Sequence, residues 1–119
     1  MNTEYKIIIK DVIGTAQCTA SEDGDKVYDM ITSHLQSSER ILLSFEGVQD
    51  LTTAFLNAAV GRLYNGDYQY DFIAAHLLPV DTNNDDLVYL KRVVDRAKSF
   101  FKTPEKFINA ESEAFGDDD

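Results

Sequence analysis

The sequence has one cysteine, two prolines, no tryptophan and no long apolar run. Because Cys18 is alone, no intrachain disulfide can form, and we interpret it as a small buried apolar residue. A membrane helix needs roughly 18 consecutive apolar residues, which the chain does not contain. The residues after Met1 lack the basic start and the apolar stretch of a secretory signal. We therefore expect a cytoplasmic protein.

Basic residues are also scarce, since 11 Lys and Arg stand against 21 Asp and Glu, for a net charge of −10. Such a chain repels phosphate backbones and anionic lipid. We therefore expect it to bind neither nucleic acid nor membranes. Residues 108–119 hold acidic residues and no basic ones, and we interpret them as a disordered acidic tail. The remainder, 1–107, is predicted to be one domain with one core.

Hydrophobic periodicity predicts an α/β fold: a small mixed β-sheet of about four strands covered by three main helices. We expect strands at 4–10 and 15–19 around a turn at 11–14, at 40–45, and at 77–80. The apolar run at 40–45 is typical of a strand buried on both faces. Pro79 indicates that the last strand lies at an edge or end. We expect helices at 22–37, 53–64 and 85–102, and a short helical turn within 68–75.

Each helix has its own predicted packing. Ser21 is expected to cap the first helix, whose apolar face holds Val27, Met30, Ile31 and Leu35. The alanines and Gly61 of the second helix allow close packing against a sheet. The third helix is expected to bury a stripe of residues spaced by three or four: Leu87, Leu90, Val94, Ala97 and Phe101.

No catalytic, metal-binding or cofactor-binding motif emerges. Asp81, Asn83 and Asp85 begin like a calcium loop, but Asp86 and Arg92 occupy the positions that require glycine and glutamate. We interpret 82–85 as a helix cap instead. The sequence has no phosphate-binding glycine loop and no metal-ligand spacing, so we predict a non-enzymatic protein without metal or cofactor. A pairing in space between His76 and an acid would revive an enzymatic function.

The junction 46–57 is the remaining candidate for a functional site. It leads from the apolar strand into the second helix, where Thr52 is the expected N-cap and Thr53 follows. The simpler interpretation, which local physics favours, is that the two threonines only cap the helix. The unpaired N–H groups of a first helical turn also stabilise a bound anion, so both interpretations stay open.

The stretch ILLSFEGVQDLTTAFLNAAVGRLY resembles the STAS domain of anti-sigma factor antagonists and sulfate-transporter tails. It is more similar to the bacterial STAS-like family of unknown function. The residues that correspond to the family's motif are Phe45, Gly47, Val48, Thr52, Thr53 and Phe55. The SEDG at 21–24 fits the family's Ser-x-x-Gly, and the resemblance extends over about 5–102.

The resemblance implies a regulatory function. In the antagonists, an Asp-Ser-Ser-Gly loop is phosphorylated on its first serine, and alignment places Thr53 at that serine and Thr52 at the aspartate. Ser44 replaces an aspartate that is usual in the STAS-like strand. The implied protein docks a signalling partner, such as a histidine-kinase-like ATPase or an anti-sigma factor, and threonine phosphorylation switches the docking. The implied binding residues are Thr52, Thr53, Asp50, Phe55, Gly47 and Asn57.

A second hypothesis from a different class is a small-ligand sensor. In this reading, an anion or a nucleotide binds at the helix N-terminus beside Thr53. Ligand binding would then raise the melting temperature by mass action.

Overall fold

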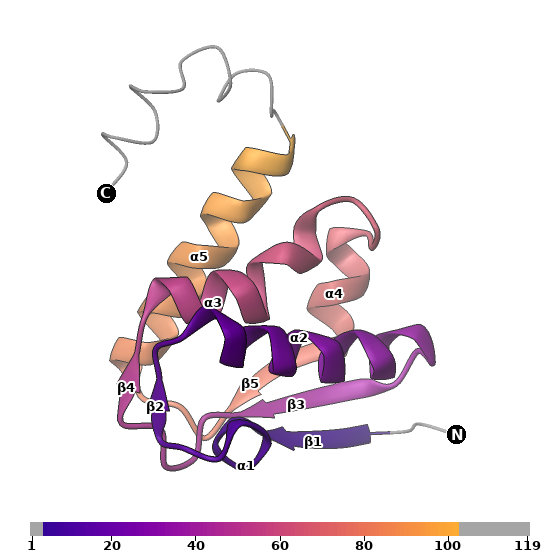
Figure 1. The fold of residues 1–119 in the computed structure, drawn as a ribbon. Coiled ribbons are helices and arrows are strands. Elements are labelled where there is room, and N and C mark those ends of the chain that lie inside the picture. Colours follow the sequence, from indigo (N-terminus) through magenta and orange to yellow (C-terminus); the bar gives the residue numbers. More distant parts are fainter. Residues whose placement is uncertain (1–3, 103–119) are drawn as a thin grey trace, which may run out of the picture.

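A computed structural model describes residues 4–102, with side chains up to residue 100. The predicted tail at 108–119 lies outside the described residues. Figure 1 shows the order of the elements. The strands are β1 (Glu4–Ile8), β2 (Gln17–Cys18), β3 (Arg40–Ser44), β4 (Asp50–Leu51) and β5 (Leu77–Val80). The helices are α1 (Ile9–Ile13), α2 (Ser21–Gln36), α3 (Thr53–Ala59), the 3-10 helix η1 (Gly61–Tyr64), α4 (Tyr70–His76) and α5 (Asn84–Lys102).

The α/β class is confirmed, but the predicted mixed sheet of four strands is wrong. β1, β3 and β5 form a three-stranded sheet with β3 in the centre, and β2 and β4 form a separate pair. Every pair is parallel. The connections permit this direction, because parallel neighbours need a crossover connection, and helices supply it between β1 and β3 and between β3 and β5. Pro79 lies in β5 at the sheet edge, as predicted.

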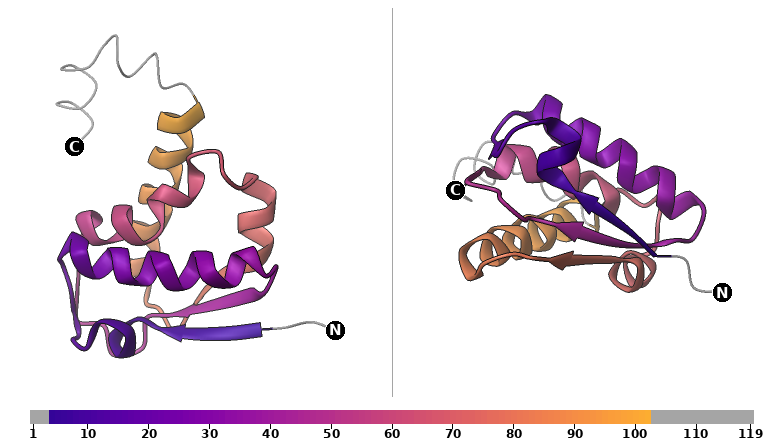
Figure 2. Two further views of the ribbon diagram at one scale, coloured as in Figure 1. Left: turned by 45° about the vertical axis from the view of Figure 1, so that its right-hand side comes forward. Right: turned by 90° about the horizontal axis from the view of Figure 1, so that it is seen from below.

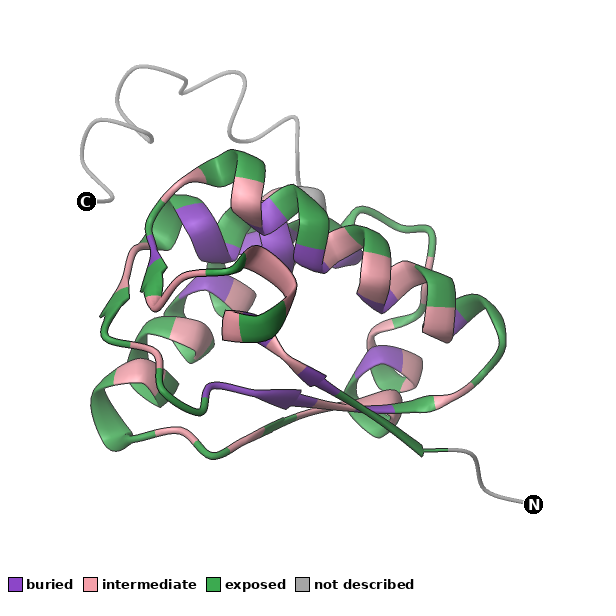
Figure 3. Cartoon of the chain, turned by 60° about the horizontal axis from the view of Figure 1, so that its bottom comes forward, coloured by how far each residue is buried: buried purple, intermediate pink, exposed green. Residues whose placement is uncertain are grey.

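Helices pack against one face of the three-stranded sheet, where α2 contacts β1 and β3 and α4 contacts β3 and β5. Ile7, Ile41 and Leu43 are buried toward this layer. On the opposite face, Lys6 is exposed and Leu42 is half-buried, so the expectation that 40–45 is buried on both faces is wrong. Figure 3 shows that β1 is exposed over its first part and buried near its end, whereas most of β3 is buried. Helices among the described residues cover one side of this sheet, and the alternate residues Ile41 and Leu43 of β3 point toward them.

The first strand is shorter than predicted, because α1 replaces the expected continuation to residue 10 and the expected turn. β1 pairs with β3 only as far as Ile8, which lies opposite Ser44, the last residue of β3. With no strand left to pair, the chain coils and buries Ile9 in the core. Gly14 ends α1 with φ 78°, and its N–H donates to the Lys10 carbonyl at 2.8 Å.

Helix α2 carries the expected apolar face, with Val27, Ile31 and Leu35 buried. The prediction for its cap is wrong. Ser21 is the first helical residue, and the N-cap is Ala20, which makes no side-chain cap hydrogen bond. Glu22 and Asp23 lie in the first turn, where their charges complement the helix dipole.

The helix predicted at 53–64 is divided into α3 and η1, and it packs mainly against α2 rather than the sheet. At Gly24 of α2, a Cβ atom would lie 2.6 Å from the Phe55 carbonyl oxygen and 2.7 Å from the Ala58 Cβ. Figure 2 shows these two helices side by side. The small residues of α3 therefore serve a close contact between helices.

The last helix begins as predicted, because the Asn83 side chain accepts the Asp86 N–H at 2.7 Å. The predicted buried stripe is partly wrong. Val93 and Ala97 are buried, whereas Leu87 is 38% exposed. α5 packs on α3 and η1, where Val93 comes within reach of Gly61, and this contact sets the buried face. The Phe101 side chain lies outside the described side chains.

Candidate functional site

Thr52 is the N-cap of α3, as predicted. Its hydroxyl accepts the Phe55 N–H at 3.2 Å and donates to the Thr19 carbonyl at 3.1 Å. The side chain is half-buried between α3 and the start of α2. Both hydrogen-bonding functions of this hydroxyl are therefore used by the fold.

Thr53 differs from its neighbour in both respects. Its side chain is exposed, and its hydroxyl makes no hydrogen bond within residues 4–102. It occupies the first position of α3, where a helical residue points away from the cap. Of the two threonines, Thr53 is the one that offers a hydroxyl to another molecule.

The other four predicted site residues are divided between the surface and the core. Asp50 and Asn57 are exposed and lie on either side of the two threonines along the chain. Gly47 forms the turn after β3 with φ 75°, a conformation that favours glycine. Phe55 is fully buried, so it supports the junction from inside and offers no surface in the free protein.

The segment before α2 holds the junction in place, a relationship that the sequence did not suggest. The Gln49 N–H donates to the Ala16 carbonyl at 2.9 Å, and the Thr52 N–H donates to the Cys18 carbonyl at 3.1 Å. The β2–β4 pairing lies between these two bonds. The loop is consequently braced along its length, and its exposed side chains are presented from a defined backbone.

Three helix starts, those of α2, α3 and α5, lie at this end of the molecule, near β2 and β4 (Figure 1). Burial raises the pKa of the Cys18 thiol to about 11, with further contributions from the charges of Asp23 and Asp86. The thiol is thus protonated at neutral pH, and the interpretation of Cys18 as a buried residue is confirmed. Partial burial, together with neighbouring Asp85, also raises the pKa of Asp86. These carboxylates disfavour a bound anion. They therefore weigh against the sensor hypothesis, which requires an anion to bind at this place.

A second polar cluster lies where β3 and β5 end. Buried Ser44 donates to Asp81 at 2.7 Å and accepts the Glu46 N–H at 3.2 Å. Lys6 of β1 lies 3.2 Å from the same Asp81 carboxylate. The Ser44 hydrogen bond and then Lys6 lower the pKa of Asp81. The cluster therefore joins a buried hydroxyl at the end of β3 to a carboxylate directly after β5.

The two histidines pair with other groups. His76 Nδ1 lies 2.8 Å from the Phe72 carbonyl oxygen, and its ring stacks on Phe72 rather than meeting an acid. His34 contacts Glu39 and stacks on Tyr5, with ring centroids 4.0 Å apart. Among residues 4–102 there is no group of three or more side chains able to hold a metal ion. None of the helices described there combines the length and apolar character needed to cross a bilayer.

The model of a protein family described as a STAS-like domain of unknown function matches residues 23–87. The chain belongs to this STAS-like family. The match runs from the first turn of α2 into α5, so it is narrower than the expected 5–102, but it contains the whole junction 46–57. No curated protein and no solved structure matches the chain.

One motif residue of this STAS-like domain has a clear physical role. Gly24, in the segment that resembles Ser-x-x-Gly, permits the close contact between α2 and α3. That contact fixes the axis of α3, and α3 in turn carries Thr53 at its first position. The motif therefore positions the exposed threonine.

Proposed function

We propose that this STAS-like domain is a non-enzymatic, cytoplasmic regulatory module that docks a protein partner through the junction 46–57. The observation that carries the proposal is the exposed Thr53 hydroxyl, which makes no hydrogen bond to the residues of 4–102 and lies on a braced loop and helix. A rigid surface binds at a lower entropic cost than a mobile one, because little order is gained on association.

The junction offers a partner mainly uncharged groups around Thr53. Gln49, Ala54 and Asn57 are exposed there, together with the carboxylates of Glu46 and Asp50. Phe55 and Thr52 act beneath this surface, the first by filling the core and the second by capping α3. Partner contact and structural support are thus divided between neighbouring residues.

Phosphorylation of Thr53 is the switch that suits this arrangement. A kinase can reach an exposed hydroxyl without breaking a hydrogen bond, whereas modification of Thr52 would remove the cap of α3. A phosphate adds about −1.5 to −2 charges, and burying it in an interface without a cationic group costs free energy. Modification at Thr53 would accordingly release the partner.

The kind of partner follows from the family resemblance alone. Anti-sigma factor antagonists bind a histidine-kinase-like ATPase that is also the anti-sigma factor, and we extend that class to this domain. The exposed junction and the position of Thr53 support the extension, since the resembling proteins dock through the corresponding loop.

The experiment is quantitative affinity capture from the native host with three baits: wild type, Thr53→Glu and Ser33→Glu. Ser33 is exposed on α2 and lies outside the junction, so its variant adds the same charge elsewhere. A true partner is recovered by wild type and by Ser33→Glu, and its recovery falls at least tenfold with Thr53→Glu. Equal recovery by all three baits would remove the docking proposal.

A separate measurement tests the switch. Intact-mass analysis of protein purified from the native host should show a phosphorylated fraction, and peptide mapping should place it on Thr53. If no growth condition yields that fraction, the switch is excluded, whereas the docking proposal is not affected.

A further inference from the structure

The three-stranded sheet ends at β1, and no described strand pairs with its outer edge. The opposite edge is β5, where Pro79 has no N–H to donate and thereby discourages further pairing. β1 carries no proline, and its sequence is rich in isoleucine and tyrosine, which favour strands. The two edges of the sheet are therefore not equivalent.

The direction of the backbone groups in β1 follows from one hydrogen bond. The N–H of Phe45, directly after β3, donates to the Val80 carbonyl. Odd-numbered residues of β3 therefore direct their backbone groups toward β5, and even-numbered residues of β3 direct theirs toward β1. Leu42 of β3 lies opposite Lys6 of β1. Its backbone groups therefore hydrogen-bond to Tyr5 and Ile7, the residues on either side of Lys6. The backbone N–H and carbonyl groups of Glu4 and Lys6 consequently point out from the sheet edge.

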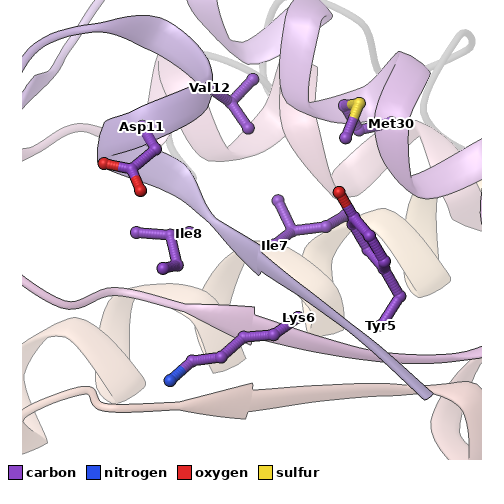
Figure 4. Close-up of a pocket in the computed structure, with 7 residues that line it drawn as sticks. All are labelled: Tyr5, Lys6, Ile7, Ile8, Asp11, Val12 and Met30. Carbon is purple, nitrogen blue, oxygen red and sulfur yellow. The ribbon is translucent and has the colours of Figure 1, made fainter.

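A groove of about 200 Å³ follows this edge, lined by Tyr5, Lys6, Ile7, Ile8, Asp11, Val12 and Met30. Figure 4 shows Tyr5 and Ile7 on the same side of β1 as Val12 and Met30, and Lys6 on the other side. Tyr5 is 40% exposed, so part of its ring remains available at this groove. An added strand would bring side chains into this groove.

The charges of β1 identify the occupant. A lysine on an edge strand ordinarily prevents pairing, but here Glu4 and Lys6 are two residues apart on one face. In an antiparallel pairing of β1 with its own copy, with Tyr5 on the two-fold axis, each Glu4 lies opposite the other copy's Lys6. The strand is self-complementary in this register, since two ion pairs flank a Tyr5–Tyr5 contact.

We propose that the protein forms a symmetric homodimer through β1, with the two sheets joined edge to edge. The outward N–H and carbonyl groups of Glu4 and Lys6 bond to their counterparts in the second copy. The Tyr5 rings meet on the helix side, where each already stacks on His34. The present partners of the two charges, Arg40 at 3.7 Å and Asp81 at 3.2 Å, lie on the open face and leave the edge accessible. The dimer uses no residue of the junction 46–57 and does not depend on the proposed function.

The experiment measures mass in solution by light scattering or sedimentation across a range of protein concentrations. Wild type should reach twice the chain mass of 13.4 kDa. Lys6→Glu places like charges opposite each other twice and should remain monomeric, and Glu4→Lys should do the same. The decisive sample is an equal mixture of the two single variants, in which every opposed pair again has opposite charges. That mixture should recover the dimer.

Circular dichroism of each single variant checks that it is folded. The double variant Glu4→Lys/Lys6→Glu serves as a second control, because it loses both intrachain ion pairs and yet should dimerise. A monomeric wild type at all concentrations would overturn the proposal. Dimers of the single variants as stable as wild type would also overturn it, because another surface would then hold the copies together.

Discussion

Gly24 of α2 and Phe55 of α3 come so close that a Cβ on the glycine would lie 2.6 Å from the Phe55 carbonyl oxygen. The obstacle is backbone, which cannot rotate away as a flexible side chain does. Phe55 itself is fully buried, and its N–H is bound by the Thr52 cap. One contact between helices thus controls both the core and the start of α3.

Gly24→Ala should lower the free energy of unfolding by about 1–3 kcal/mol, the usual range for overpacking a close contact. The sign of the stability change is informative, because the same substitution in an unobstructed helix stabilises the protein by roughly 1 kcal/mol. Chemical denaturation at one protein concentration measures it, with Ser33→Ala on the exposed face of α2 as the control. A more stable Gly24→Ala protein would show that α2 and α3 are farther apart than described.

The neighbouring threonines should respond differently to the same substitution. Thr52→Ala removes an N-cap hydroxyl and should cost about 0.5–2 kcal/mol of stability. Thr53→Ala removes an exposed hydroxyl without a hydrogen bond and should change stability by no more than about 0.5 kcal/mol. Thermal and chemical unfolding of the pair checks this. Equal losses would mean that Thr53 also supports the fold.

Asp81 should make stability depend on acid pH. Its pKa is lowered in the folded protein by the Ser44 hydrogen bond and by Lys6, so its contribution is complete above the unfolded pKa of about 4 and disappears as the pH falls through the lower folded value. Asp81→Asn tolerates the same φ of 55° and removes only the charge. The difference in unfolding free energy between wild type and variant should be constant above about pH 5 and shrink below it. A difference that does not vary with pH would contradict the assignment.

Cys18 should resist thiol reagents in the native protein. It is fully buried, and its raised pKa keeps the thiolate scarce at neutral pH. We expect negligible labelling under native conditions and one labelled thiol per chain in denaturant, measured by mass spectrometry. Rapid labelling of the native protein would show that the β2–β4 region opens readily.

The elements that local pattern predicted are those with strong, uninterrupted signals. β3 was recognisable from its apolar run, and the spacing of Val27, Ile31 and Leu35 gave the buried face of α2. The cap at Thr52 also followed from local chemistry, because a hydroxyl two residues before the first apolar side chains of a helix is a common start.

What escaped prediction depends on partners distant in the sequence. β4 has only two residues, too few for periodicity to register, and it exists because it pairs with β2, which lies within the strand predicted at 15–19. Ile9 turns into α1 because β3 ends at Ser44, which no pattern within residues 4–14 reveals. Ser44 and Asp81 lie 37 residues apart, and the chain brings them together only after β5 has joined the sheet. Distant contacts also explain why Leu87 is exposed. It has the helical spacing of a buried residue, but it lies beyond the part of α5 that contacts η1.

Site-specific photo-cross-linking at two exposed glutamines tests docking through the junction most directly. A photoreactive residue replaces Gln49, in the junction, or Gln36, at the end of α2. The labelled proteins are then irradiated in the native host. We expect a discrete protein adduct from position 49 that diminishes when Thr53→Glu is added, and no such adduct from position 36. An adduct that forms at position 36 and not at 49 would contradict docking through the junction.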